Sequence, residues 1–171
     1  LDYGMGGDQW VFPLQLVSDK AKLKDLIQQA SPGDMPSFDG TLQLAQTGLK
    51  GIQAASKHVV IISDADPSGP SKDLIAAMVQ DRITITTVAI GPHGSSDVEK
   101  MAAVARYSGG RFYEVTDPSK LPQIFIKEAA TLQRSMIIEG SIPPVVLSNS
   151  DALKGLPRDG RHPRDMRRHQ A

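Results

Sequence analysis

The amino-acid sequence predicts a three-layer α/β fold, with a mostly parallel sheet and helices on both of its faces. Residues 57–63, KHVVIIS, hold four consecutive apolar β-formers between polar residues, a pattern typical of a strand buried on both faces. Extended and helical segments then alternate through residues 57–134. This alternation predicts right-handed crossover connections onto a parallel sheet.

The composition suits one folded domain followed by a tail, since the chain has 171 residues. Lys plus Arg and Asp plus Glu both number 19, so the formal net charge is zero. A zero net charge does not favour binding to nucleic acid or to an anionic membrane. The absence of cysteine excludes disulfides, thiolate metal sites and a cysteine nucleophile. No apolar run approaches the length of a bilayer span, so we expect no membrane contact by this segment. Because the sequence opens on Leu1, we expect it to be cut from a longer protein.

The residues before the buried strand predict one edge strand and two helices. Residues 10–17, WVFPLQLV, have a strand pattern interrupted by Pro13. Such a segment suits an antiparallel edge strand, because an edge can spare one ladder donor. Ser18 is a candidate N-cap for an amphipathic helix that ends at Pro32, and Asp39 is a candidate cap for a second one.

Beyond residue 63 the sequence predicts regular alternation. The expected elements are a helix at 71–80, a strand at 82–91, a helix at 97–108, a strand at 111–115 and a last helix that opens at Asp117. Gly109 and Gly110 end the helix before them in the manner of a C-cap. Ligands of open parallel sheets bind beyond the carboxyl ends of the strands. The loops at 64–70 and 92–96 are therefore the candidate binding face.

The composition divides the chain into three parts. Residues 1–134 form the expected domain, and residues 135–156 are the expected linker toward a next domain. Residues 157–171 are rich in Arg and His and poor in apolar residues, so we expect a disordered basic tail. Such a tail is more often solvated than bound to nucleic acid, so we expect no nucleic-acid partner.

Two carboxylates directly follow the most buried predicted strand. Asp64 comes immediately after VVIIS, and Asp66 lies two residues further on. An aspartate at this position either caps the following turn or helps to hold a hard cation such as magnesium. Its position alone favours the capping role.

Several runs, taken in order, resemble one known family. KHVVIISDADPSGP, ITITTVAIGPHG and MAAVARYSGGRFYEVTDPSKLPQIFIKEA together resemble bacterial von Willebrand factor type A domains over about residues 1–134. GDMPSFDGTLQLA is similar to a segment of large bacterial membrane-anchored proteins with a neighbouring glutamine-amidotransferase-like domain. The resemblance implies a Rossmann-like fold whose first, central strand is missing here. It also implies a parent protein of the bacterial cell envelope.

The resemblance also implies where a metal ion would bind. Family members hold a divalent cation through a D-x-S-x-S motif, a threonine and an aspartate from three loops. Here no D-x-S-x-S occurs, and the threonine position falls on Pro36, beside Ser37. Asp64 matches the aspartate, with Ala65 in place of the usual glycine. We therefore expect an incomplete metal-ion-dependent adhesion site of Asp64 and Ser37, with Mg²⁺ bound only if the missing strand supplies the other ligands.

The leading functional hypothesis is a non-enzymatic module that binds a protein partner with its upper face. No G-x-S-x-G, phosphate-loop lysine motif or nucleophile–base pair is evident, so no catalytic residue is expected. The residues expected on the face are Asp34, Asp39, Asp66, Ser68 and His93. The alternative is a small-molecule- or nucleotide-binding α/β domain of a larger enzyme. A glycine-rich strand-to-helix turn would favour that alternative, and none is seen.

Overall fold

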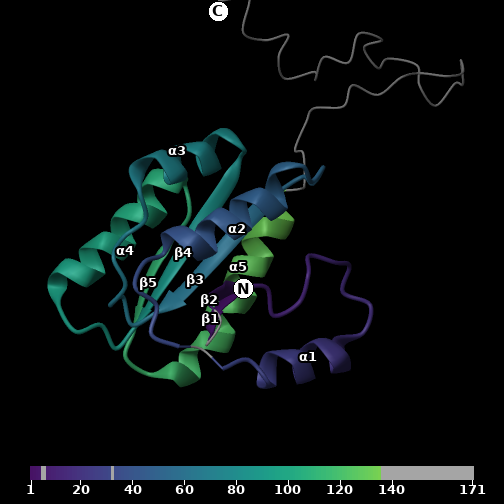
Figure 1. The fold of residues 1–171 in the computed structure, drawn as a ribbon, viewed down its shortest axis with the longest axis horizontal. Helices are drawn as coiled ribbons and strands as arrows, with labels where there is room; N and C mark the ends of the chain where they lie inside the picture. The colour runs from purple at the N-terminus through teal and green to yellow at the C-terminus, as the bar shows by residue number, and fades with distance from the viewer. Residues whose placement is uncertain (5–6, 32, 136–171) are drawn as a thin grey trace, which may run out of the picture. The chain divides into compact units, whose positions relative to one another are not determined.

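The computed structural model describes residues 1–4, 7–31 and 33–135. The expected linker and tail lie outside these residues, apart from Ser135. The strands are β1 (Asp2–Gly4), β2 (Gly7–Gln9), β3 (Lys57–Ser63), β4 (Ile83–Ile90) and β5 (Phe112–Val115). The helices are α1 (Lys20–Gln28), α2 (Asp39–Lys50), α3 (Lys72–Gln80), α4 (Ser95–Ser108), the 3₁₀ turn η1 (Pro118–Lys120) and α5 (Leu121–Ser135) (Figure 1). None of the described helices is long and apolar enough to cross a membrane.

The predicted parallel sheet is confirmed, with strand order β3-β4-β5. The β3–β4 pairing runs from Lys57 opposite Ile83 to Ser63 opposite Ala89. The shorter β5 pairs with the second half of β4, from Thr87 opposite Phe112 onward. This order leaves β3 at one edge of the three-stranded sheet. The carboxyl ends of β3 and β4 open onto the same side, where the candidate binding loops lie.

The predicted edge strand at residues 10–17 is wrong. The antiparallel pair is instead β1 with β2, in a two-stranded sheet of its own. Pro13 lacks an amide donor, and the apolar side chains beyond it find little cover: Leu16 is 91% exposed and Val17 is 65% exposed. The apolar run WVFPLQLV is therefore an irregular segment and not a strand.

Two predicted helix caps are also corrected. The helix α1 is capped by Asp19 and not by Ser18, because the Asp19 carboxylate accepts a hydrogen bond from the Lys22 amide at 3.0 Å. Asp39 is the first residue of α2, and Phe38 precedes it at the cap. The Asp39 carboxylate instead accepts a hydrogen bond from Ser71 N at 2.7 Å, so it links α2 to the loop before α3.

The main core lies between the sheet and the layer of α2, α3 and α4. Ile83 and Ile85 of β4 point to this side, and both are at most 1% exposed. Thr87 points the same way and donates a hydrogen bond to the Met101 carbonyl of α4 at 2.8 Å. The buried residues of this core are Phe38, Leu42, Ala65, Leu74, Ile75, Met78, Ile83, Ile85 and Met101. The burial of these apolar side chains is the main stabilising contribution on this face.

The opposite face of the sheet carries a buried polar cluster that holds α5. Glu128 of α5 is 2% exposed. Its carboxylate accepts hydrogen bonds from Thr86 Oγ1 at 3.0 Å, from Tyr113 OH at 2.7 Å and from two nitrogens of Arg111, each at 2.7 Å. His58 Nε2 lies 3.4 Å from the same carboxylate. One side chain thus connects α5 to all three parallel strands and to the residue before β5.

This cluster sets the charge state of its members. Burial raises the pKa of Glu128, but the hydrogen bonds from Arg111, Tyr113 and Thr86 outweigh it and lower the pKa from 4.5 to about 2. Burial lowers the pKa of His58, and Arg111 adds to that effect against the opposing pull of Glu128. The folded protein therefore holds an ionised Glu128 and disfavours protonation of His58.

Acidification should therefore destabilise the protein through Glu128. A carboxyl whose folded pKa lies below its unfolded pKa stabilises the fold above the unfolded value, and this contribution disappears as the pH falls toward the folded value. The fall from 4.5 to about 2 corresponds to about 3 kcal/mol. Urea unfolding across this acidic range should show the loss in the wild type. Glu128→Gln should be less stable at neutral pH, with a flatter acid slope.

The control for this prediction is Glu114→Gln, because Glu114 is an exposed residue of β5. His58 also destabilises the folded protein on acidification. Its pKa is lower in the folded than in the unfolded state, so stability is lost as the pH falls below about 6.5. An acid slope in Glu128→Gln as steep as in the wild type would contradict the prediction.

Candidate functional site

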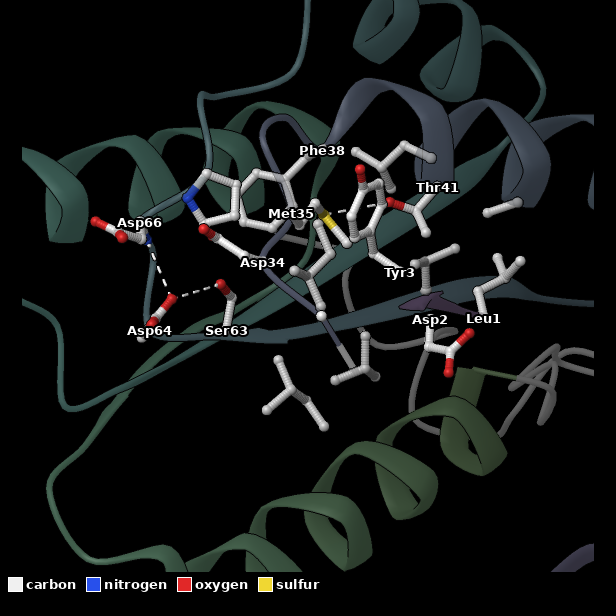
Figure 2. A pocket seen from close by; sticks show the side chains of 18 of the residues that line it. Leu1, Asp2, Tyr3, Asp34, Met35, Phe38, Thr41, Ser63, Asp64 and Asp66 are labelled. Carbon is white, nitrogen blue, oxygen red and sulfur yellow. Dashed lines mark hydrogen bonds between the residues drawn. The ribbon is translucent and has the colours of Figure 1, made fainter. Parts of the chain in front are cut away.

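The candidate face is built at the carboxyl ends of β3 and β4. The loop after β3 carries Asp64 and Asp66, and the loop after β4 carries His93. A third segment, residues 34–38, leads into α2 beside the first loop. Figure 2 shows Asp34, Ser63, Asp64 and Asp66 gathered at one end of a pocket.

The loop after β3 is shaped by its own side chains. Asp64 Oδ1 accepts the Asp66 amide at 3.2 Å, the turn-capping role that its position favoured. Ser63 Oγ accepts the Ala65 amide at 3.1 Å. Between these bonds, Ala65 is fully buried and has a φ of 74°. This left-handed conformation is unfavourable for a residue with a Cβ, which is a physical reason for glycine to be usual at this place.

The segment at 34–38 is fastened to the loop after β3. Ser37 and Ser68 form a parallel β-bridge. Both the amide and the hydroxyl of Ser68 donate to the Pro36 carbonyl, at 3.1 and 2.9 Å. The bond from Ser71 N to the Asp39 carboxylate adds a further tie. Predicted face residues Ser68 and Asp39 therefore serve to join two loops that lie about thirty residues apart in sequence.

Lys100 of α4 supports the same loop from another side. Its Nζ donates to the carbonyls of Ala65 and Pro67, each at 3.4 Å, and pairs with Asp97 at 3.0 Å. The hydrogen bond from Lys100 lowers the pKa of Asp97. The loop is thus held by α4 as well as by the segment before α2, so its exposed carboxylates project from a braced backbone.

The structure brings His93 to Asp66, a pairing that sequence reasoning missed. His93 Nδ1 lies 3.7 Å from Asp66 Oδ1, and both side chains are exposed. Together with Asp64 they form a cluster whose candidate ligand atoms all lie within 4.8 Å of one another. Residues 66 and 93 are far apart in sequence, so no local spacing connects them. The sequence could have indicated this pairing only through the order of the strands, since Asp66 and His93 follow two parallel strands that are neighbours in the sheet.

The side chains at this face do not fit a tightly held magnesium ion. Magnesium requires several oxygen ligands in near-octahedral geometry, whereas imidazole suits transition metals. Here the groups that converge are two carboxylates and one imidazole, while Asp64 Oδ1 also accepts the Asp66 amide and the Ser37 hydroxyl accepts the Asp39 amide at 3.2 Å. Asp64 and Ser37, the expected pair, each stabilise the turn that carries them.

The pocket beside this face has a volume of about 600 Å³. It is bordered by five consecutive residues of β3, by α2 and by residues 1–3. Figure 2 shows Asp64 and Asp66 at one end and Leu1, Asp2 and Tyr3 at the other. The predicted face residue Asp34 also lines it, whereas His93 stands outside it.

Comparisons with known proteins agree with this architecture. The family model described as the von Willebrand factor type A domain matches residues 8–127. Among solved structures, the crystal structure of the conserved hypothetical protein BatB from Bacteroides thetaiotaomicron is similar, with a TM-score of 0.57 and 13% sequence identity. The match covers 68% of this chain and 71% of that one. At this identity the likeness concerns the fold alone. A search of the curated proteins found no match.

Replacing Ala65 by valine should destabilise the protein, because a β-branched side chain would meet both a left-handed backbone and a fully buried position. We expect a loss of about 2 kcal/mol or more in the free energy of unfolding, measured by urea denaturation. The matched variant Ala65→Gly relieves the backbone but removes a buried methyl group, so its stability should change by only about 1 kcal/mol. Equal stability of the valine variant and the wild type would show that this conformation imposes no constraint.

Proposed function

Because this chain belongs to the von Willebrand factor type A domain family, we propose that it is a non-enzymatic module that binds a protein partner with the face built from the loops after β3 and β4. Domains of this family generally mediate protein interactions. We further propose that the partner contacts the exposed carboxylates of Asp64 and Asp66 and the imidazole of His93. By its resemblance, the module would serve a bacterial cell-envelope or membrane-anchored protein.

The proposal rests on the hydrogen bonds that hold the backbone of the loop after β3 in place while its charged side chains stay exposed. The loop after β3 is tied to Pro36, Asp39 and Lys100 by five hydrogen bonds from or to its backbone and side chains. A partner that binds such a loop loses little free energy to ordering it. Asp66 and His93 are both about two-thirds exposed, so a partner can reach them directly.

The chemistry of the face supports binding better than catalysis. The hydroxyl of Ser68 donates to Pro36 O, and the hydroxyl of Ser63 lies 3.3 Å from Asp64 Oδ1. His93 has Asp66 as its ion-pair partner among the described residues, with no serine placed to be activated by it. Nucleophilic catalysis needs a hydroxyl or thiol within hydrogen-bond reach of its base. The serines of this face instead stabilise the loops.

The proposed binding face is tested by reversing one exposed charge on it. The full chain, Asp66→Arg and the distant control Asp25→Arg on α1 would each be immobilised for affinity capture from a bacterial extract. A true partner should be retained by the wild type and the control and lost with Asp66→Arg, because the added cation repels what the carboxylate attracted. Retention of the same partner by Asp66→Arg would place the binding surface elsewhere.

We also propose that this chain holds Mg²⁺ no more tightly than the millimolar range, which is about −4 kcal/mol of binding free energy. The reason is that the cluster offers two carboxylates and one imidazole, whereas magnesium prefers several oxygen ligands in octahedral geometry. Isothermal titration of the wild type and of Asp64→Ala should give the same weak response. Micromolar binding that disappears in Asp64→Ala would instead establish a functional site in this loop.

A further inference from the structure

The loops after β3 and β4 bring one imidazole together with two carboxylates. His93 Nδ1 lies 3.7 Å from Asp66 Oδ1. With Asp64 added, the candidate ligand atoms of the three side chains all lie within 4.8 Å of one another, and all three residues are exposed. Elsewhere in the described residues, no group of three or more His, Asp or Glu side chains is arranged in this way. The cluster is thus a distinctive feature of this face.

The atoms of this cluster have room to receive an ion. Within the described residues, both hydrogen bonds to the Asp64 carboxylate end on Oδ1, one from the Asp66 amide and one from the Ser63 hydroxyl. The second oxygen of Asp64 therefore remains available. Two ligands of a tetrahedral Zn²⁺ ion, each about 2.1 Å from the metal, lie about 3.4 Å apart. The 3.7 Å between His93 and Asp66 is close to that separation, so small rotations of exposed side chains would suffice.

The types of donor atom select the class of metal ion. An imidazole nitrogen suits zinc, copper and nickel, whereas magnesium prefers oxygen ligands alone. Zinc is commonly bound by histidine and carboxylate ligands, and an open site has three protein ligands with water in the fourth position. Asp66 and His93 have no counterpart in the D-x-S-x-S, threonine and aspartate pattern of the family's magnesium site. The donor set therefore disagrees with that site and favours a zinc-type ion.

The charges around the cluster also favour a cation. Lys100 is the nearby basic side chain, and its Nζ pairs with Asp97 at 3.0 Å while donating to two backbone carbonyls of the loop after β3. Asp97 thus offsets the charge of Lys100. The carboxylates of Asp64 and Asp66 then leave a net negative charge beside the imidazole. A divalent cation would be attracted to this position.

We propose that Asp64, Asp66 and His93 bind Zn²⁺ through two carboxylate oxygens and the imidazole Nδ1, with water completing the coordination. The ligands come from residues 64–66 and 93, which all lie in loops that the structure describes. The hydrogen bonds that hold the loop after β3 keep two of the three ligands in place before the ion arrives. This inference goes beyond the proposed protein-binding function and does not depend on a partner.

Isothermal titration of the full 171-residue chain with zinc chloride tests this inference. Zn²⁺ should bind at least about a hundredfold more tightly than Mg²⁺. His93→Asn and Asp66→Asn should each weaken zinc binding at least about tenfold, because each removes one ligand. The matched control His162→Asn removes a histidine from the C-terminal basic segment and should bind as the wild type does. Zinc binding no tighter than magnesium binding, or unchanged by His93→Asn, would overturn the proposal.

NMR of the ¹⁵N-labelled wild type gives a second test that does not depend on how the variants fold. Added Zn²⁺ should shift the Nδ1 resonance of His93 and the amide resonances of residues 64–70 and 92–96, because the ion binds there. Zinc-induced shifts confined to His162 and His169 would overturn the proposal by assigning the ion to the C-terminal segment. Partner capture in the presence of a chelator tests the proposed protein-binding function without zinc, so either proposal can fail alone.

Discussion

The parallel pairing of β3 with β4 is the constraint on which the rest of this structure depends. Seven residue pairs in register bring the ends of the two strands to the same level. One face of β4 then presents Ile83 and Ile85 to the main core, while the other presents Thr86 to Glu128. The same register places the loop of Asp66 beside the loop of His93. Core, polar cluster and candidate face are therefore consequences of one strand pair.

The candidate face differs from an ordinary flexible loop because several of its backbone groups form hydrogen bonds with other parts of the protein. Ser68 joins it to the segment before α2, and Lys100 joins it to α4. This bracing also explains how the unfavourable left-handed conformation of Ala65 persists, since strained backbone is kept only where the surroundings over-determine it. The consequence is a fixed array of exposed acidic groups, which suits recognition of a partner better than it suits a closed metal cage.

Much of the parallel sheet could be predicted from the sequence, because the VVII run and its alternation with amphipathic helices are local signals. The failures have physical causes that lie outside such patterns. Residues 10–17 are rich in apolar residues as a strand is, but Pro13 lacks an amide N–H and Leu16 and Val17 remain exposed. Asp39 has the residue type of a cap, yet its carboxylate is used by Ser71, thirty-two positions away in the chain. The meeting of Asp66 with His93 depends in the same way on strand order, which no local spacing encodes.

Within the described residues, the register that organises this structure pairs β3 with β4 along one edge only. Because the amides of successive strand residues point to opposite edges, hydrogen exchange by NMR should give alternating protection along Val59–Ile62, with every second amide exchanging rapidly. Along Thr87–Ala89, which have a partner on both sides, protection should be continuous. Uniform protection of β3 equal to that of β4 would contradict the account, since it would mean that the second edge of β3 is also paired.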